Sequence, residues 1–325
     1  MTMAIRIHQT GGPEQMVWED IDPGAPGEGE VLIKHTAVGL NFIDVYHRTG
    51  LYPLPGGPFS PGMEAAGVVS AIGHGVSGVR EGDRVAYATP PVGAYAEQRI
   101  LAADRVVKIP DNLPDQTAAA MMLQGLTAHY LLRRTYRVQS GDTILIHAAA
   151  GGVGLIACQW ARHLGATVIG TVGSTEKAEL ARSHGCEFPV LYKEQDFVEA
   201  VERITGGGKL PVVYDSVGRD TFQKSLNCLR PLGMMVLFGQ SSGGVPPLDL
   251  GVLAAKGSLF LTRPTLMTYT AKREDLVSGA EELFDVVASG AVKIEINQTY
   301  ALKNAAQAHM DLEGRKTTGS TVLIP

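Results

Sequence analysis

The chain has 325 residues, of which 45% are hydrophobic and 19% charged, with a formal net charge of −5. This length suffices for two domains with substantial cores, and the acidic balance argues against a broad basic surface for nucleic acid. No run approaches 18 apolar residues, which argues against a membrane span, and three cysteines without a CxxC pattern indicate a reducing compartment, the cytoplasm.

Residues 1–125 are rich in short apolar runs separated by Gly, Pro and Asp turns, a pattern typical of β-strands. One short helix is expected near residues 41–48. Asp44 is expected to cap or orient this helix rather than to act as acid or base, because a carboxyl group of low pKa is a poor proton donor at neutral pH. The pattern predicts a compact, barrel-like domain.

The stretch from 142 to 177 predicts a strand, a glycine turn, a helix and a second strand. We expect these elements, in that order, at 143–148, 151–154, 155–164 and 167–172. This βαβ unit binds the pyrophosphate of a dinucleotide at the N-terminus of its helix.

The glycines of this turn have separate tasks. Gly151 and Gly152 let the backbone approach phosphate oxygens, and Gly154 lets the helix pack close to the strand. Ala148 stands where a glycine is usual, so the motif alone is a moderate signal and its context carries the prediction. A glycine turn with a purely structural role is the alternative.

The end of the second strand predicts which dinucleotide is bound. An NAD site usually has Asp or Glu there to bind the ribose hydroxyls, but this chain has Gly173 and Ser174, followed by Lys177. A hydroxyl and an ammonium group can bind a 2′-phosphate, which predicts NADPH. In the alternative interpretation, Lys177 is an ordinary solvated helix residue.

Strand and helix patterns alternate beyond this unit, giving six strands when counted from Thr143. The predicted fold is α/β, with a doubly wound, parallel six-stranded Rossmann sheet beside the β-rich barrel domain. We place the dinucleotide-binding domain at 126–265. The first domain, 1–125, is expected to be completed by 266–325, whose elements exceed the six-stranded core.

Ordered motifs along the whole chain identify a family. They are GLNFIDVYHRTGLYP (39–53), PGMEAAGVVSAIG (61–73), GDRVAYA (82–88), QGLTAHYLL (124–132), HAAAGGVG (147–154), GTVGSTEK (170–177), VVYDSVG (212–218) and FGQSSG (238–243). The chain resembles the zinc-free NADPH:quinone oxidoreductases (zeta-crystallin-like) of the medium-chain dehydrogenase/reductase superfamily, in particular the bacterial ones. The resemblance implies a GroES-like first domain and a quinone bound in the interdomain cleft against the nicotinamide.

The resemblance also makes three residues informative. Zinc alcohol dehydrogenases of the superfamily hold their catalytic metal with Cys, His and Cys, whereas the corresponding positions here are Asn41, Met63 and Gln124. None offers a thiolate or an imidazole, so no zinc is expected. Zinc-free hydride transfer suits a conjugated acceptor such as a quinone, with an enone or alkenal as the alternative, because the product charge is delocalised.

The resemblance implies residues for both substrates. Asn41, Tyr46 and Tyr52 are expected to line the acceptor site, where the tyrosines either donate a proton or, in the preferred interpretation, pack. The residues expected to contact NADPH are Asn41, Tyr46, Thr127, Tyr130, Gly151, Gly152, Val153, Gly173, Ser174, Lys177, Tyr192, Ser216, Gly218, Phe238, Gly239, Ser241, Arg263 and Arg315. Arg263 and Arg315 could instead be surface cations.

The apolar segment 258–264 is the last strand of the predicted sheet, and an apolar edge must be covered or paired. Because family members pair it across a two-fold axis, we expect a homodimer; a monomer with the edge capped by the preceding loop is the alternative. Relatives that act as lens structural proteins or bind RNA leave a non-catalytic, dinucleotide-binding role open. The absence of a Lys/Arg stripe weighs against nucleic acid.

Overall fold

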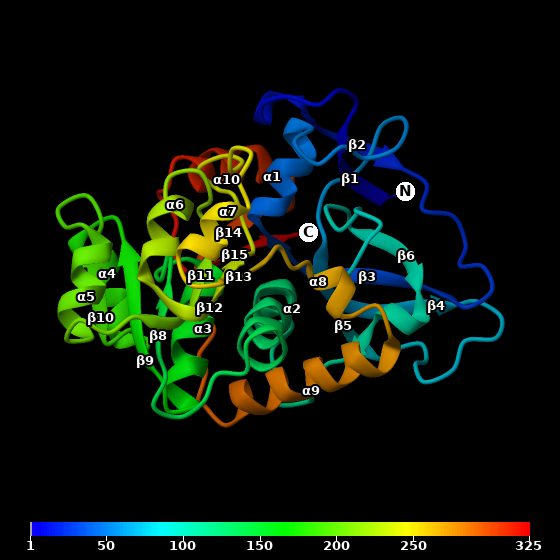
Figure 1. Cartoon of the computed structure of the whole chain (residues 1–325). Helices are drawn as coiled ribbons and strands as arrows, with labels where there is room; N and C mark the ends of the chain where they lie inside the picture. The colour runs from blue at the N-terminus through cyan, green and yellow to red at the C-terminus, as the bar shows by residue number, and fades with distance from the viewer. Residues whose placement is uncertain (1) are drawn as a thin grey trace. The chain divides into compact units, whose positions relative to one another are not determined.

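The structure is a computed structural model that describes residues 2–325. The chain divides into two compact units, which are described separately (Figure 1). The first unit contains the residues up to 126 together with 270–284 and 294–325. The second contains residues 127–269 and 285–293.

The second unit is built on a six-stranded sheet in which all strands run parallel, in the order β10-β9-β8-β11-β12-β13. Its strands are β8 (Thr143–Ile146), β9 (Thr167–Val172), β10 (Phe188–Leu191), β11 (Leu210–Asp215), β12 (Leu229–Leu237) and β13 (Phe260–Thr262). The order is that of a doubly wound dinucleotide-binding sheet, so the predicted Rossmann fold is confirmed.

Apolar, β-branched sequences explain this sheet. All six residues of β11 are buried, as expected for a central parallel strand covered on both faces. The helices of the unit are α3 (Gly152–His163), α4 (Thr175–Ser183), α5 (Phe197–Ile204), α6 (Phe222–Ser225), α7 (Gly251–Ala255) and α8 (Leu266–Tyr269). The edge strand β13 is shorter than the predicted 258–264, because Ser258 adopts a positive φ of 56° before it and Pro264 follows it.

The first unit is β-rich. Its strands are β1 (Thr2–Ile7), β2 (Met16–Ile21), β3 (Glu30–Leu40), β4 (Glu64–Ile72), β5 (Arg84–Ala88), β6 (Gln98–Ala102), β7 (Val107–Lys108), β14 (Ile296–Ala301) and β15 (Ser320–Ile324). β1 pairs with β2, and the others form a seven-stranded sheet in the order β14-β15-β3-β4-β5-β7, with β6 paired to β3. The C-terminal strand β15 thus lies antiparallel to β3 (Figure 1).

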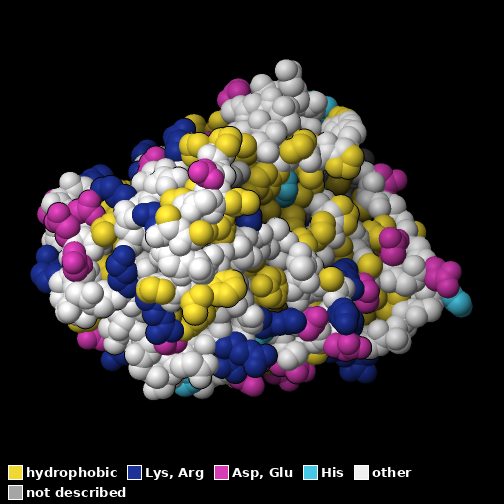
Figure 2. All heavy atoms as spheres, viewed as in Figure 1, with side chains coloured by type: hydrophobic (Ala, Val, Ile, Leu, Met, Phe, Trp, Pro, Cys, Tyr) yellow, Lys and Arg dark blue, Asp and Glu magenta, His cyan; other side chains and the backbone are white. Residues whose placement is uncertain are grey.

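Helix α1 (Phe42–Thr49) follows β3 directly, at the predicted place. Three longer helices complete the description: α2 (Asp115–His129), which continues as a π-helical segment over Tyr130–Thr135, α9 (Arg273–Ala288) and α10 (Ala305–Glu313). Within residues 2–325, no helix is both long and apolar enough to cross a membrane. On the face seen in Figure 2, lysine and arginine side chains are interspersed with acidic ones.

Candidate functional site

The turn between β8 and α3 presents backbone atoms to its surroundings. Gly151 is the N-cap of α3, and a Cβ added at Gly154 would lie 2.3 Å from the carbonyl oxygen of Ala148. That contact is too short for any side chain, so only glycine fits at position 154. The first turn of α3, which the structure describes completely, contains no acidic residue. Its N–H groups and partial positive charge therefore suit a pyrophosphate.

Ala148 makes the turn that a glycine usually makes. Its φ is 54°, in the left-handed region that disfavours a side chain by roughly 1–2 kcal/mol. The N–H group of Gly151 donates to the Ala148 carbonyl oxygen at 2.9 Å and closes the turn. Ala148 therefore adopts the backbone conformation that a glycine would favour at this position.

Four predicted cofactor residues lie near the ends of β9 and β10. A Cβ added at Gly173 would lie 3.0 Å from the hydroxyl oxygen of Tyr192, whose side chain is 43% exposed. Ser174 is the N-cap of α4, and its Oγ accepts from the backbone N–H of Lys177 at 3.4 Å. Gly173 thus lies close to Tyr192, and Ser174 is hydrogen-bonded to Lys177.

A carboxylate stands closer to this cluster than the sequence interpretation assumed. Glu176, in the first turn of α4, accepts a hydrogen bond from the Ser174 side chain, which lowers the pKa of Glu176. Glu176 is fully exposed, so water and salt screen its charge. A 2′-phosphate bound here would compete with Glu176 for the Ser174 hydroxyl group.

The carboxyl ends of β11 and β12 form the next part of the site. The N–H of Ser241 donates to the carbonyl oxygen of Ser216 at 3.1 Å, and a Cβ at Gly239 would lie 2.6 Å from that same oxygen. Gly218 has a φ of 88°, a conformation that favours glycine. The predicted residues Ser216, Gly218, Phe238, Gly239 and Ser241 therefore lie on two loops that touch each other.

Sequence reasoning missed Asp215, which holds the first of these loops in shape. Its Oδ1 accepts from the backbone N–H groups of Val217 at 2.7 Å and Gly218 at 3.0 Å and from the Thr221 hydroxyl at 2.9 Å. Asp215 is fully buried. An aspartate that ends an apolar strand, three residues before a glycine, was the available signal.

Tyr130 begins the π-helical segment, an irregularity frequent at functional sites. Its ring stacks on that of Tyr269, with centroids 4.5 Å apart, and burial raises its pKa. Thr127 lies within hydrogen-bonding reach of Tyr130. Arg263 donates to the carbonyl oxygen of Leu237, at the end of β12.

Arg315 lies in the first unit, in the turn that ends α10. It is exposed and has a positive φ of 58°, and its N–H donates to the Leu312 carbonyl at 3.0 Å.

The predicted acceptor residues gather on α1 and the loop after it. Tyr46 and Tyr52 have ring centroids 5.0 Å apart, and the N–H of Tyr52 donates to the Tyr46 carbonyl at 3.0 Å. Asn41 is the N-cap of α1 and is buried. Its Nδ2 donates to Glu64 at 2.5 Å and its Oδ1 accepts from Gln124 at 3.1 Å.

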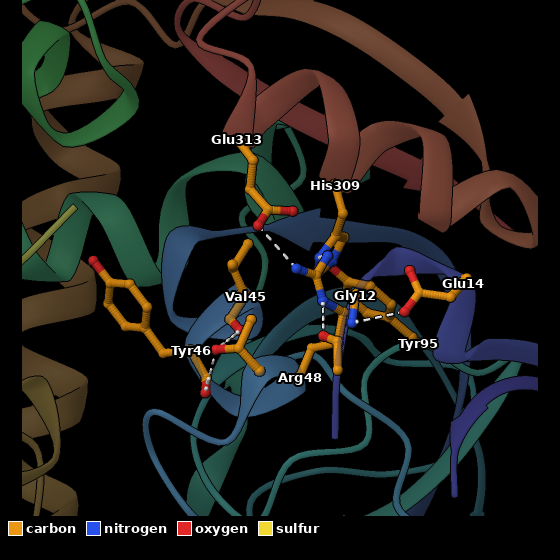
Figure 3. Close-up of polar contacts among 10 residues, drawn as sticks. Gly12, Glu14, Val45, Tyr46, Arg48, Tyr95, His309 and Glu313 are labelled. Carbon is orange, nitrogen blue, oxygen red and sulfur yellow. Dashed lines mark hydrogen bonds and ion pairs between the residues drawn. The ribbon is translucent and has the colours of Figure 1, made fainter. Parts of the chain in front are cut away.

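Asp44 caps α1 as predicted, since its Oδ2 accepts from the Asn41 N–H at 2.9 Å. The assumption of a low pKa was wrong, because burial raises the pKa of Asp44 to about 7. Tyr95 donates to Asp44 at 3.1 Å and contacts His309 Nε2 at 3.1 Å. The rings of Tyr95 and His309 lie near Arg48 of α1 in Figure 3.

Arg48 ends this buried chain. It contacts His309 Nδ1 at 3.2 Å and donates to Glu313 at 2.9 Å (Figure 3). Because a guanidinium only donates, Nδ1 accepts and the proton of the neutral imidazole is on Nε2, directed at Tyr95. Burial lowers the pKa of His309 to about 3, which keeps it neutral. The chain anchors the helix that carries Tyr46 to α10.

The residues at the positions of zinc ligands in alcohol dehydrogenases do not suit a metal. Asn41 and Gln124 hydrogen-bond to each other, and the third position holds the thioether of Met63, which is buried. Zinc in proteins prefers thiolate, imidazole or carboxylate ligands. Among residues 2–325, no cluster of three or more His, Cys, Asp or Glu side chains could hold a metal ion.

Comparisons with known proteins cover the whole chain. Residues 27–111 match the family of alcohol dehydrogenase GroES-like domains, and residues 152–282 match the zinc-binding dehydrogenase family. The chain is 52% identical over 325 residues to a quinone oxidoreductase of Pseudomonas aeruginosa, with all of both chains covered. It is 49% identical to a 2-haloacrylate reductase of a Burkholderia species, covering 100% of this chain and 99% of that one.

The solved structures agree with the sequence relatives. The fold matches the crystal structure of Escherichia coli quinone oxidoreductase complexed with NADPH, with a TM-score of 0.98 and 49% identity, covering 99% of this chain and 100% of that one. The family assignment follows from the high sequence identity over the full length of both chains, together with the Rossmann sheet and the GroES-like domain. The chain belongs to the quinone oxidoreductases of the medium-chain dehydrogenase/reductase superfamily.

Proposed function

We propose that this protein catalyses the NADPH-dependent reduction of quinones. The observation that carries the proposal is the full-length likeness, at a TM-score of 0.98, to a quinone oxidoreductase complexed with NADPH. The tight turn between β8 and α3 supports it as well, because a Cβ at Gly154 would lie 2.3 Å from the carbonyl oxygen of Ala148, so that the turn forms only with glycine at this position. The balanced reaction consumes NADPH, one proton and a quinone, and yields NADP⁺ and a hydroquinone.

We assign cofactor binding to the domain at 126–265, and acceptor binding to the domain formed by 1–125 and completed by 266–325. Gly151, Gly152 and Val153 would hold the pyrophosphate. The end of β9 with Gly173, Ser174, Lys177 and Tyr192 would hold the adenosine 2′-phosphate. The nicotinamide half would meet Asn41, Tyr46, Thr127, Tyr130, Ser216, Gly218, Phe238, Gly239 and Ser241, with Arg263 and Arg315 as further cationic contacts.

NADPH, when bound, supplies the hydride. The contribution of the chain is to orient the acceptor and to stabilise the charge that develops on it. We assign a hydrogen bond from Asn41 to the acceptor carbonyl, and a stacking role to Tyr46 and Tyr52, whose paired rings offer an apolar face. Hydroquinone oxygen atoms can take their proton from water.

The test is NADPH oxidation measured against quinones, enones and aldehydes, with and without a chelator. We expect turnover with quinones, a preference for NADPH over NADH, and no effect of the chelator. Stoichiometric NADPH binding without turnover of any acceptor would contradict catalysis and favour a purely dinucleotide-binding role.

A conjugated carbon–carbon double bond is a second candidate acceptor. A relative that is 49% identical over the full length is a 2-haloacrylate reductase, which acts on an activated alkene. The same orientation of a carbonyl by Asn41 would serve an enone. Comparison of kcat/KM for a quinone and an enone of similar size decides which acceptor class is preferred.

We also propose that the protein forms a homodimer through β13. This strand ends the sheet, and its Phe260 and Leu261 are 56% and 37% exposed, with the exposed Leu232 and Leu250 as further apolar side chains of the unit. Pairing an apolar edge removes it from water. Gel filtration at micromolar concentration should give twice the single-chain mass; the single-chain mass would refute the dimer.

The cysteines support a reducing compartment, which we propose to be the cytoplasm. Cys158, Cys186 and Cys228 are buried free thiols. Contact with Cys186 and burial raise the pKa of Cys158. Thiol titration of the unfolded protein, purified without a reducing agent, should find three free thiols.

A further inference from the structure

Four buried side chains from four segments form one hydrogen-bond chain in the first unit. They are Ser320 at the start of β15, Gln124 of α2, Asn41 at the N-cap of α1, and Glu64 at the start of β4. Each is at most 7% exposed. The chain lies beside the tyrosines of the proposed acceptor site, because Asn41 immediately precedes the helix that carries Tyr46.

All hydrogen bonds of this chain donate in one direction, from Ser320 towards Glu64. Ser320 Oγ donates to Gln124 Oε1 at 2.7 Å, Gln124 Nε2 donates to Asn41 Oδ1 at 3.1 Å, and Asn41 Nδ2 donates to Glu64 Oε1 at 2.5 Å. The other carboxylate oxygen, Oε2, accepts from the backbone N–H of Leu123 at 2.6 Å. A backbone N–H cannot become an acceptor, so Glu64 is the fixed end of the chain.

The surrounding backbone holds Glu64 in place. A Cβ at Gly39 would lie 2.3 Å from Glu64 Oε1 and 2.4 Å from the carbonyl oxygen of Ala119. Glycine at position 39 therefore makes room for the carboxylate. Glu64 itself is completely buried.

We propose that Glu64 is a positioning residue whose carboxylate fixes the direction of this chain, and thereby keeps an amide N–H of Asn41, rather than its carbonyl oxygen, turned towards the acceptor carbonyl. Each amide nitrogen has two N–H groups, and the chain uses one from Asn41. The second remains to bind an acceptor oxygen. This inference rests on the proposed function and assigns the polarity of its acceptor site.

The hydrogen-bond chain from Ser320 to Glu64 can reverse its direction without losing a hydrogen bond. If position 64 donated to Asn41, the Asn41 amide would turn over and donate to Gln124, and the Gln124 amide would turn over and donate to Ser320. The Ser320 hydroxyl could still donate to the carbonyl oxygen of Ala120, which lies 3.0 Å away. Reversal would place the Asn41 carbonyl oxygen where its N–H had been, and two carbonyl oxygens repel each other.

Protonation of Glu64 would also reverse these hydrogen bonds, because the O–H group of a carboxylic acid donates to Asn41. Burial, with a smaller contribution from the charge of Asp44 on α1, raises the pKa of Glu64 to about 8. The phenols of Tyr87 on β5 and of Tyr95 also interact electrostatically with Glu64. The donor orientation of Asn41 therefore requires the ionised carboxylate and is lost as the pH falls below about 8.

The experiment compares wild type with Glu64→Gln and with the double variant Glu64→Gln/Gln124→Glu. In the single variant, the new amide oxygen accepts from Leu123, so its NH₂ group faces Asn41 and reverses the chain. The double variant keeps the buried carboxylate but moves it to the other side of Asn41. At pH 9 both variants should lower kcat/KM for the quinone about tenfold or more, the value of one hydrogen bond to a carbonyl.

Two further readouts separate positioning from a structural role. The ratio of wild-type to Glu64→Gln kcat/KM should fall towards one as the pH is lowered from 9 to 6, and any change in the dissociation constant for NADPH should be smaller than the change in kcat/KM. Glu97→Gln is the matched control, because Glu97 also accepts from a backbone N–H, that of Met3, at 2.9 Å. It should leave kcat/KM unchanged.

Wild-type kcat/KM in the double variant, or a ratio that is independent of pH, would overturn the inference, because the double variant retains the charge and the number of hydrogen bonds. Failure of the wild type to reduce any quinone would instead contradict the proposed function. A neutron structure of the wild type at pH 9 should show deuterium between Asn41 Nδ2 and Glu64; finding Asn41 Oδ1 there would overturn the inference directly.

Discussion

The glycine turn after β8 and the Asn41 cluster beside β4 do their work with different parts of the chain. The turn uses backbone N–H groups and requires glycines, which have no side chain. A Cβ at Gly154 would lie only 2.3 Å from the carbonyl oxygen of Ala148. The cluster uses side chains from four segments, whose value depends on which atom of each amide donates. The first region should therefore be sensitive to volume, and the second to the direction of its hydrogen bonds.

The largest effect is expected from a change of volume at the turn. In Gly154→Ala the new methyl group meets the backbone of Ala148 and Ala149, which cannot rotate away. We expect NADPH affinity to fall about a hundredfold, as for the loss of one or two charge-assisted hydrogen bonds, and the free energy of unfolding to fall by about 1–3 kcal/mol. Fluorescence titration and thermal unfolding measure the two effects.

Gly57→Ala is the control for that substitution. Its new Cβ would meet no atom within 4 Å among the described residues, and its φ is not positive. NADPH affinity should stay as in the wild type. If Gly154→Ala bound NADPH equally well, the turn would not be the pyrophosphate site.

The second prediction concerns the cost of the buried charge in the cluster. The pKa of Glu64 is raised from 4.5 to about 8 in the folded protein, so between these values the folded state binds more protons than the unfolded state. The free energy of unfolding therefore falls as the pH rises through this window, by up to about 1.4 kcal/mol per pH unit from this group. Below pH 4.5 both states are protonated and the contribution is constant.

Glu64→Gln removes this dependence. The free energy of unfolding of the variant, measured by urea denaturation, should rise relative to that of the wild type as the pH is raised from 5 to 8. Asp44, whose pKa is also raised, is present in both proteins, so the difference reports Glu64 together with its electrostatic interaction with Asp44. Parallel pH profiles for the two proteins would show that Glu64 is not buried in the folded state as described.

The third prediction tests whether the adenosine end also depends on side-chain charge. Lys177→Glu should lower the NADPH/NADH selectivity about ten- to a hundredfold, through the loss of one charge-assisted contact and new repulsion. Glu176→Gln is the matched variant on the same turn of α4. It removes the carboxylate that competes for Ser174 and should raise NADPH affinity slightly, because Glu176 is exposed. Unchanged selectivity in Lys177→Glu would remove this residue from the site.

The two regions also differ in how far the sequence could predict them. The turn is contiguous, so Gly151, Gly152 and Gly154 between two apolar runs were enough to predict the strand, the helix and the phosphate site. Likewise, alternating apolar segments predicted all six parallel strands. The cluster is assembled from residues 41, 64, 124 and 320, and no local pattern indicates that an amide, a carboxylate and a hydroxyl so far apart will meet.

Chemistry set by burial was equally out of reach. Asp44 was correctly expected to cap α1, but the sequence offered no sign that burial would raise its pKa to about 7. The hydrogen bond between Ser174 and Glu176 could not be predicted, because position in the sequence does not show which way a side chain in the first turn of a helix points. Resemblance to a family supplied Asn41 and Gln124 as candidates, but not the hydrogen bond between them.

The smallest effect is expected at the tyrosine pair of the proposed acceptor site. The rings of Tyr46 and Tyr52 lie 5.0 Å apart, a pairing worth about 0.5–1.5 kcal/mol. Tyr52→Phe keeps the ring and should change kcat/KM for quinones by less than about threefold, whereas Tyr52→Ala should cost several-fold more through a higher KM. If Tyr52→Phe instead lowered kcat as much as Tyr52→Ala, the hydroxyl group would be the proton donor, and direction rather than volume would govern this part of the acceptor site too.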